Sequence, residues 1–385
     1  MLSRRFFLGL CVAQFFIAAH PCRADLSAKA SAKAGANVTV ETGEIAGAKF
    51  TLARPAHWNK RVLLLAHGYR DAALPLVADL SPDQLAYKTL LDEGWIVAKT
   101  SYRRNGIIVA DAIADLDALR DRIEKKFGTP DRVLLEGESM GGLIVTLMAE
   151  RDLPEPRRYH GAVAIGAALQ VKEDNTRIGL NLQPTLPLLF LTNQTEIDGP
   201  RAYVTTKLRP ADHPEQLRPV LFRVSRDGHV NVNQRERLAA LRAVNTWLDL
   251  GRAALPQPAV RAPFFDATVV PDPQPSKVTL HADGRGFDAR VTEVADNYGN
   301  VVIDARPADF AAAGIKTMTW FQLAAHGQTY RVRVGRDFDS VKRGEWVAFP
   351  SADGLFWLAR NNADAAATAA LKVGDPVTLQ RYDEK

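Results

Sequence analysis

Cysteine is scarce in this chain of 385 residues. Its two cysteines, Cys11 and Cys22, lie within the first 24 residues, so the rest of the chain has no disulfide framework of its own. Long apolar runs are missing too, because none reaches the roughly 18–20 residues of a transmembrane helix. We therefore expect a chain without a membrane span and without structural disulfides.

A strong charge of one sign is also missing. The formal net charge is +5, but residues 1–24 hold three arginines and no acid, and without them 46 basic side chains face 44 acidic ones. This balance argues against a nucleic-acid or membrane-surface partner. The histidines and acids show no metal-ligand spacing, so we expect neither a metal nor a cofactor.

The first segment has the pattern of an export signal. Arg4 and Arg5 precede an apolar stretch from Phe6 to Ala19, and a small-x-small ending follows at Cys22–Ala24. The stretch Ser3–Leu8 also resembles a twin-arginine signal, which directs the export of folded proteins. We predict a signal peptide at 1–24 and a bacterial protein that is periplasmic or secreted.

A proline-rich stretch divides the remaining chain. Proline lacks a backbone N–H and disfavours helix in the residue before it, so we predict an extended linker over 256–275. It separates a region at 25–255 from a region at 276–385, and both have the size of a domain. The prolines are Pro256, Pro258, Pro263, Pro271, Pro273 and Pro275.

The region before the linker alternates strand-length apolar runs with helical periodicity. Near-continuous apolar strands indicate a sheet covered on both faces, and strand–helix alternation indicates an α/β fold with a doubly wound, mainly parallel sheet. Helices are expected at Val109–Phe127 and Gln234–Leu250. The expected strands lie at 62–66, 95–98, 133–135, 161–165, 186–191 and 220–224.

The region after the linker has a different pattern. Short alternating stretches at 278–281, 330–334 and 346–349 are separated by glycine and aspartate turns. This pattern predicts a small all-β barrel or sandwich.

One motif carries most of the functional information. Gly137-Glu138-Ser139-Met140-Gly141 satisfies G-x-S-x-G, with a strand expected before it and a helix after it. A strand–turn–helix of this kind holds a nucleophilic serine in a strained turn. Gly137 and Gly141 are expected because a side chain at either position would collide across the turn.

A serine nucleophile needs a base and an orienting acid. In the chain order Ser–acid–His, His229 has the position of the base, after the last expected strand and before the final helix. The acid should follow the strand at 186–191, where Glu196 and Asp198 both qualify. The sequence leaves these two carboxylates open.

Two backbone N–H groups are needed to stabilise an oxyanion. One is expected from Met140, next to the nucleophile, and the other from Tyr69 in the stretch His67-Gly68-Tyr69. The side chain of His67 is expected to be structural.

Through these motifs, residues 38–250 resemble the α/β-hydrolase superfamily, and particularly exported bacterial esterases. In this superfamily a lid is usually inserted after the strand that here ends near Ala168. Only residues 169–185 separate that strand from the next one, which is too short for a lid domain. The resemblance therefore implies a site that is open unless the C-terminal region covers it.

Residues 288–383 resemble the C-terminal β-barrel domain of the S-adenosylmethionine hydroxide adenosyltransferases. The resemblance lies in four ordered segments, at 296–300, 338–345, 354–361 and 371–377. It implies a ligand pocket lined by Asn300, Phe338, Arg360 and Asn361. The N-terminal domain of that family is missing here, so hydrolysis of adenosylmethionine is not expected.

The leading interpretation is an exported serine hydrolase that cleaves small carboxylic esters through an acyl-enzyme on Ser139. One alternative is a peptidase or amidase with the same triad. Another is a non-catalytic protein that binds a nucleoside through its barrel. The barrel is also a candidate for homo-oligomerisation, because in the resembling family it lies at a subunit boundary.

Overall fold

The computed structural model describes residues 38–151, 157–207, 209–256, 264–269, 275–295 and 299–382. The predicted signal at 1–24 lies outside these residues. So do most of the predicted linker and the start of the 296–300 segment. Within the described part, no helix is both long and apolar enough to cross a bilayer.

The first sheet has the doubly wound order expected of an α/β hydrolase. Only the first two strands run antiparallel to their neighbours, and the rest pair in parallel. In spatial order the described strands are β1 (Val38–Ile45), β2 (Ala48–Pro55), β4 (Ile96–Thr100), β3 (Arg61–Ala66), β5 (Arg132–Glu138), β6 (Gly161–Ile165), β9 (Leu188–Asn193), β10 (Val220–Val224) and β11 (Phe264–Asp266).

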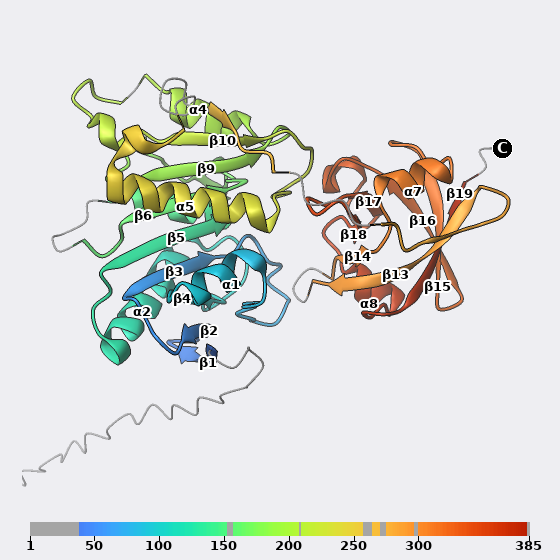
Figure 1. The fold of residues 1–385 in the computed structure, drawn as a ribbon, viewed down its shortest axis with the longest axis horizontal. Helices are drawn as coiled ribbons and strands as arrows, with labels where there is room; N and C mark the ends of the chain where they lie inside the picture. The colour runs from blue at the N-terminus through green and yellow to red at the C-terminus, as the bar shows by residue number, and fades with distance from the viewer. Residues whose placement is uncertain are drawn as a thin grey trace, which may run out of the picture.

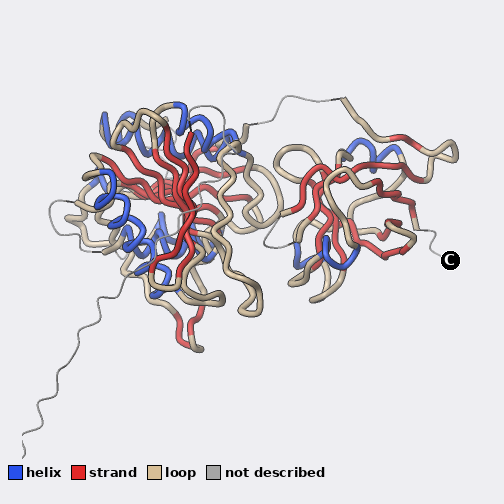
Figure 2. The backbone as a smooth tube through the Cα atoms, turned by 90° about the horizontal axis from the view of Figure 1, so that it is seen from below, coloured by secondary structure: helices blue, strands red, loops and turns tan. Residues whose placement is uncertain are grey.

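Helices cover both faces of this sheet (Figure 2). Helices α2 (Val109–Phe127) and α3 (Met140–Ala149) pack on one face, while α1 (Leu85–Asp92) and α5 (Gln234–Leu250) pack on the other. Successive strand residues face opposite sides, so Leu64 joins the first core and Leu63 the second. Burial on both faces explains why the strands are apolar throughout.

The start of α5 is set by local sequence. Asn233 caps the helix by accepting a hydrogen bond from the N–H of Glu236, whose side chain accepts one from the N–H of Asn233. This capping box satisfies two N–H groups that a helix leaves without partners. It places the first residue of α5, Gln234, five residues after His229.

The segment expected to carry no lid forms a short hairpin. Strands β7 (Lys172–Glu173) and β8 (Thr176–Arg177) pair with each other outside the main sheet. Helix α4 (Asp198–Thr205) and the 3₁₀ turn η1 (Glu215–Leu217) then connect β9 to β10.

Part of the predicted linker belongs to the first sheet. Strand β11 pairs in parallel with β10, and a further turn, η2 (Arg252–Ala254), precedes it. The N–H of Ala267 also donates to the carbonyl oxygen of Arg223. The many prolines predict an extended segment but not a strand. In the structure, the short stretch with two aromatic residues between the prolines nevertheless pairs with the edge of the sheet.

The C-terminal region is a closed barrel, one of the two all-β forms that the short alternating stretches predicted. Seven strands form the ring, β12 (Thr279–Leu280) adds to its rim, and β16 and β17 are the parallel pair. In ring order the seven are β13 (Gly286–Val294), β14 (Val301–Ile303), β18 (Phe356–Arg360), β17 (Trp346–Pro350), β16 (Gln328–Val334), β15 (Trp320–Ala325) and β19 (Pro376–Arg381).

An aromatic cluster fills the barrel. Phe310 of helix α7 (Pro307–Ala312) stacks on Phe356 at 3.8 Å between ring centroids, and it also contacts Phe287 and Phe321 edge-on. Helix α8 (Ala365–Ala369) contributes its buried alanines to the same core. The interior is therefore packed with side chains, as in other small barrels.

Candidate active site

Ser139 lies in the turn between β5 and α3, with an unusual backbone conformation. Its φ is 54° and its ψ is −115°, a region that non-glycine residues rarely adopt. The neighbouring strand holds the turn in place, since the N–H of Ser139 donates to Ile165 at 2.9 Å and its carbonyl oxygen accepts from Ala168 at 3.0 Å. Such strain is characteristic of functional turns.

Both glycines of the motif are required by close backbone contacts. A Cβ at Gly137 would lie 2.1 Å from the carbonyl oxygen of Gly141, so it would collide across the turn. A Cβ at Gly141 would lie 2.0 Å from the carbonyl oxygen of Ala66. The second collision is with the end of β3, so the approach of the neighbouring strand explains this glycine.

Ser139, His229 and Glu196 form one chain of hydrogen bonds. The Oγ of Ser139 lies 2.9 Å from Nε2 of His229, and Nδ1 of His229 lies 2.7 Å from Oε2 of Glu196. With the proton on Nδ1, His229 donates to the carboxylate and can accept the serine proton at Nε2. The three groups come from the ends of β5, β9 and β10, which meet at the carboxyl edge of the sheet.

The structure shows which of the two candidate acids contacts His229. Glu196 also accepts a hydrogen bond from the N–H of Val230 at 3.0 Å, so each of its carboxylate oxygens holds the His229 loop. A Cβ at Gly166 would lie 2.6 Å from Glu196 Oε1, which explains a glycine at that position. The side chain of Asp198 is 96% exposed and pairs with Arg201 at 3.3 Å. Asp198 therefore belongs to the first turn of α4, and Glu196 is the partner of His229.

Several hydrogen bonds fix the loop that carries His229. The carbonyl oxygen of Gly228 accepts from Asn193 and Thr195, each at 2.8 Å. Arg226 binds both carboxylate oxygens of the buried Glu236. These contacts connect the loop to β9 and to the start of α5, so the position of the imidazole is fixed without a bound substrate.

The charge around His229 raises its pKa above the ordinary value. Burial lowers this pKa, but the hydrogen bond and negative charge of Glu196 outweigh burial, and Glu138 and Asp339 add to the increase. The imidazolium that forms when His229 takes a proton is therefore stabilised.

The two expected oxyanion donors flank Ser139. Met140 is the first residue of α3, where a backbone N–H has no acceptor within the helix. A Cβ at Gly68 would lie 3.2 Å from the Cβ of Ser139, so the loop that carries Tyr69 passes directly beside the serine.

His67 is structural, as expected. Its ring is buried and stacks on Tyr102 at 4.0 Å between centroids. Its nitrogens face the carbonyl oxygens of Gly68 and Ser101. Burial, with the nearby charges of Arg70 and Lys99, lowers its pKa to about 3, so the ring is neutral and positions the loop.

A buried ion-pair network supports the serine turn and was not predicted from the sequence. Arg237 of α5 binds Glu136 of β5 and Glu138, the residue before Ser139, and Tyr87 donates to Glu136 at 2.9 Å. Burial raises the pKa of Glu136, whereas Arg237 holds that of Glu138 below its usual value despite burial. The sequence offers one sign of this network, because Glu136 and Glu138 stand at the end of an otherwise apolar strand. Buried charges need partners of opposite charge.

The barrel contacts the loops that surround this site (Figures 1 and 2). Asn231, two residues after His229, donates to the carbonyl oxygen of Pro350 at 3.0 Å. Arg336 lies 3.8 Å from Asp227, and Arg343 lies 4.0 Å from Asp71 in the loop after Tyr69. The barrel therefore contacts both the loop that carries His229 and the loop after Tyr69.

Three of the four candidate pocket residues make contacts within the barrel itself. Arg360 donates twice to the carbonyl oxygen of Gly344, and Asn361 donates to that of Val341 at 2.9 Å. Phe338, in the turn η3 (Phe338–Ser340), packs edge-on against Phe349 in a small cluster separate from the barrel core. Asn300 is buried before β14.

The arrangement of Ser139, His229 and Glu196 suits nucleophilic attack on a carbonyl carbon. Among the residues that the structure describes, no group of three or more histidine, cysteine or acidic side chains could hold a metal ion.

Two sequence families match parts of the chain. Residues 107–215 match the family described as "Serine aminopeptidase, S33". This stretch includes Ser139 and Glu196 and ends before His229. Residues 292–378 match the "SAM hydroxide adenosyltransferase C-terminal domain".

A curated relative and two solved structures are similar to parts of the chain. An o-phthalyl amidase from Xanthobacter agilis is 33% identical over 134 residues, which are 34% of this chain and 27% of the relative. This chain therefore spans about a quarter of that relative's length. Est1E from Butyrivibrio proteoclasticus has 15% identity and a TM-score of 0.38, covering 54% of this chain and 96% of its own.

XC6422 from Xanthomonas campestris, described as an α/β serine hydrolase without a lid, has 14% identity and a TM-score of 0.38. The similarity covers 55% of this chain and 96% of that protein. From the strand order and the serine turn, the chain has an α/β-hydrolase fold followed by a closed β-barrel, and this barrel is similar to the S-adenosylmethionine hydroxide adenosyltransferase C-terminal domain over residues 292–378.

Proposed function

We propose that this protein is a serine hydrolase that cleaves small carboxylic esters through an acyl-enzyme on Ser139. The observation that carries the proposal is the hydrogen-bond chain from Ser139 through His229 to Glu196, with distances of 2.9 and 2.7 Å. A serine hydroxyl is a weak nucleophile unless a base accepts its proton. Here the base lies within reach of Oγ, and a carboxylate stabilises its charged form.

The proposed reaction has two halves. Oγ of Ser139 attacks the acyl carbon while its proton moves to Nε2 of His229, and the N–H groups of Met140 and Tyr69 bind the oxyanion. The oxyanion collapses, the alkoxide leaves, and His229 returns the proton to it. Water then attacks the acyl-enzyme by the same route, which releases the acid and restores Ser139.

Exposed apolar side chains suggest what kind of substrate fits. Tyr69, Leu74 and Ile107 are among the large apolar residues that remain exposed. They lie on two loops joined by hydrogen bonds from Gly106 to Arg70 and from Asn105 to Leu74. Because the loop that carries Tyr69 passes beside Ser139, these exposed apolar groups favour an ester with an apolar substituent.

Amide cleavage is the alternative, and the similarity to the o-phthalyl amidase favours it. The same triad can serve both reactions, since His229 would protonate a leaving amine as it would an alkoxide. The sequence of residues 1–24 supports export, so we place the reaction in the periplasm or outside the cell.

The test is fluorophosphonate labelling of the chain from residue 25 onward, measured by intact mass, beside a Ser139→Ala variant. We expect a single adduct in the first protein and none in the variant. Ester and amide substrates with the same acyl group then separate the two activities by kcat/KM. A folded protein that takes no label and cleaves neither substrate would refute the proposal.

A further inference from the structure

A polar cavity lies away from Ser139, at the opposite end of β10. Its volume is about 420 Å³, and the chain between α4 and β10 forms most of its wall. The cavity reaches Pro219, just before β10, whereas the His229 loop follows the other end of that strand. A strand of five residues spans about 16 Å, so a molecule in this cavity does not touch the serine.

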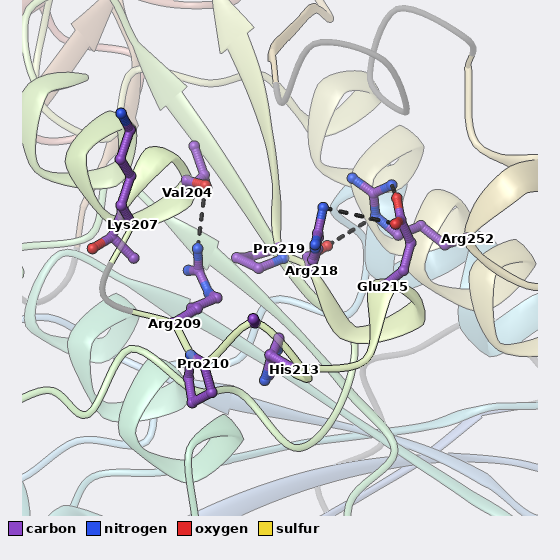
Figure 3. A pocket seen from close by; sticks show the side chains of 11 residues that line it. Val204, Lys207, Arg209, Pro210, His213, Glu215, Arg218, Pro219 and Arg252 are labelled. Atoms are coloured by element: carbon purple, nitrogen blue, oxygen red, sulfur yellow. Dashed lines mark hydrogen bonds and ion pairs between the residues drawn. The ribbon is translucent and has the colours of Figure 1, made fainter.

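The wall of this cavity is strongly basic. Lys207, Arg209, Arg218 and Arg252 line it together with His213, and Glu215 is the one carboxylate among the lining residues. Figure 3 shows Lys207 and Arg209 on one side of Pro219, and Arg218, Glu215 and Arg252 on the other. Four cationic side chains thus share one acid.

That acid pairs only loosely with its neighbours. Glu215 lies 3.7 Å from Arg218 and 3.8 Å from Arg252, and its own side chain is largely exposed. Within the described part of the chain, neither Lys207 nor Arg209 pairs with a carboxylate. A largely exposed carboxylate at such distances neutralises little charge, and one acid faces four cations, so the cavity keeps a surplus of positive charge.

Backbone contacts hold the arginines in this arrangement. Arg209 donates to the carbonyl oxygens of Tyr203 and Val204 at the end of α4, and Arg252 donates to that of Arg218 at 3.0 Å. Carbonyl oxygens position a guanidinium group without cancelling its charge. The Nε of Arg209 and the Nε2 of His213 are both buried and make no hydrogen bond in the described structure.

Burial works against these charges. It lowers the pKa of Arg209 and of Arg252, and the charge of Arg218 adds to both effects. Burial, with the charges of Arg209 and Arg218, also lowers the pKa of His213. A bound anion would relieve this repulsion, because opposite charge favours the protonated forms.

We propose that this cavity binds a small multivalent oxyanion, a molecule with phosphate or carboxylate groups. Guanidinium groups suit such oxygens because their N–H groups form a planar fork. The volume exceeds that of a single phosphate, so we expect two anionic groups on one ligand to bind better than one. This site is independent of the reaction proposed for Ser139.

The test is isothermal titration calorimetry of the full exported chain with inorganic phosphate, pyrophosphate and citrate. Chloride at equal ionic strength is the reference. We expect pyrophosphate or citrate to bind more tightly than phosphate. The comparison between those two distinguishes a phosphate ligand from a carboxylate one.

The variant is the double substitution Lys207→Gln and Arg218→Gln, because both side chains are exposed and neither supports the fold through a short ion pair. The matched control is Lys88→Gln with Arg242→Gln, two exposed cations outside the cavity. We expect the variant to weaken binding by about tenfold or more and the control to leave it unchanged.

Circular dichroism verifies that both double variants fold. Two results would overturn the proposal. One is that no anion binds the unmodified chain more tightly than chloride does. The other is that the cavity variant binds as tightly as the control.

Discussion

Asn231 joins the two domains beside the proposed base: its Nδ2 donates to the carbonyl oxygen of Pro350 in the barrel and to that of Asp227 in its own loop. One amide therefore holds both the turn that carries His229 and the domain next to it. Its side chain is buried, so these bonds are shielded from water. The barrel thus takes part in shaping the site.

Replacing this amide by an acid should disturb the site without changing its size. Asn231→Asp places a carboxylate against two carbonyl oxygens, and we expect a loss of about 1–3 kcal/mol in the free energy of unfolding. We also expect kcat to fall more than KM changes, because the His229 loop loses its support. Denaturant unfolding and steady-state kinetics measure the two effects, with the exposed Gln183→Glu as control. Unchanged stability and kcat would show that the contact has no role.

The two candidate acids should respond very differently to loss of charge. Glu196→Gln leaves the shape of the site but removes the carboxylate that orients His229, so kcat should fall by about 10²–10⁴-fold. Asp198→Asn should change kcat less than about twofold, because Asp198 is exposed and pairs with Arg201. Steady-state kinetics of both variants test this assignment. Equal losses would contradict it.

The raised pKa of His229 predicts the acidic limb of the pH profile. His229 must be neutral to accept the serine proton, so kcat/KM should fall as the pH drops below this pKa, with a midpoint above 6.5. Asp339 of the barrel contributes to the increase. Asp339→Asn removes a negative charge and should move the midpoint to lower pH.

The control for this pH shift is Asp283→Asn, in a turn of the barrel outside these contacts. It should leave the midpoint unchanged. A pH profile identical in all three proteins would mean that the barrel does not affect His229.

The serine turn should tolerate no side chain at its first glycine. Gly137→Ala puts a Cβ against the backbone of Gly141, and we expect a loss of about 3 kcal/mol or more together with loss of labelling at Ser139. Gly179→Ala is the matched control, because a Cβ there meets nothing within 4 Å. Thermal unfolding and fluorophosphonate labelling of the two variants give the comparison. A stable Gly137→Ala protein that still takes the label would contradict the geometry.

Arg237 should be important for stability although it does not touch the proposed reacting atoms. Arg237→Met leaves the buried Glu136 without its positive partner and also removes the partner of the half-buried Glu138, which should cost about 3–5 kcal/mol in the free energy of unfolding. Arg242→Gln, at an exposed ion pair on the same helix, should change it by less than about 0.5 kcal/mol. Urea unfolding followed by circular dichroism distinguishes the two.

Much of the fold could be predicted because it depends on local patterns. The apolar runs at 62–66, 161–165 and 220–224 became β3, β6 and β10, and the helical period from Val109 ended at Phe127 as expected. Apolar residues follow one another along a buried strand but recur every three or four positions along an amphipathic helix. A short stretch of sequence is therefore enough to tell the two apart. The position of His229 also followed from chain order alone.

Other features could not be derived from local patterns. Phe264–Asp266 lies among prolines and still extends the sheet edge, because the edge of β10 is available to pair with it. The ion pairs of Arg237 join residues about one hundred positions apart in the chain. A contact between such distant residues leaves no periodic pattern in the sequence from which it could be predicted.

The sequence by itself therefore determined the order of the elements and the serine turn, which depend on local patterns, and the position of His229, which follows from its place in the chain order. Tertiary structure decided between Glu196 and Asp198, placed the barrel beside the His229 loop, and gathered four cations into one cavity. The physical reason is that hydrogen bonds and charge act through space. Glu196 and Asp198 are two positions apart and both carry a carboxylate, so the fold decides which of them lies within reach of His229.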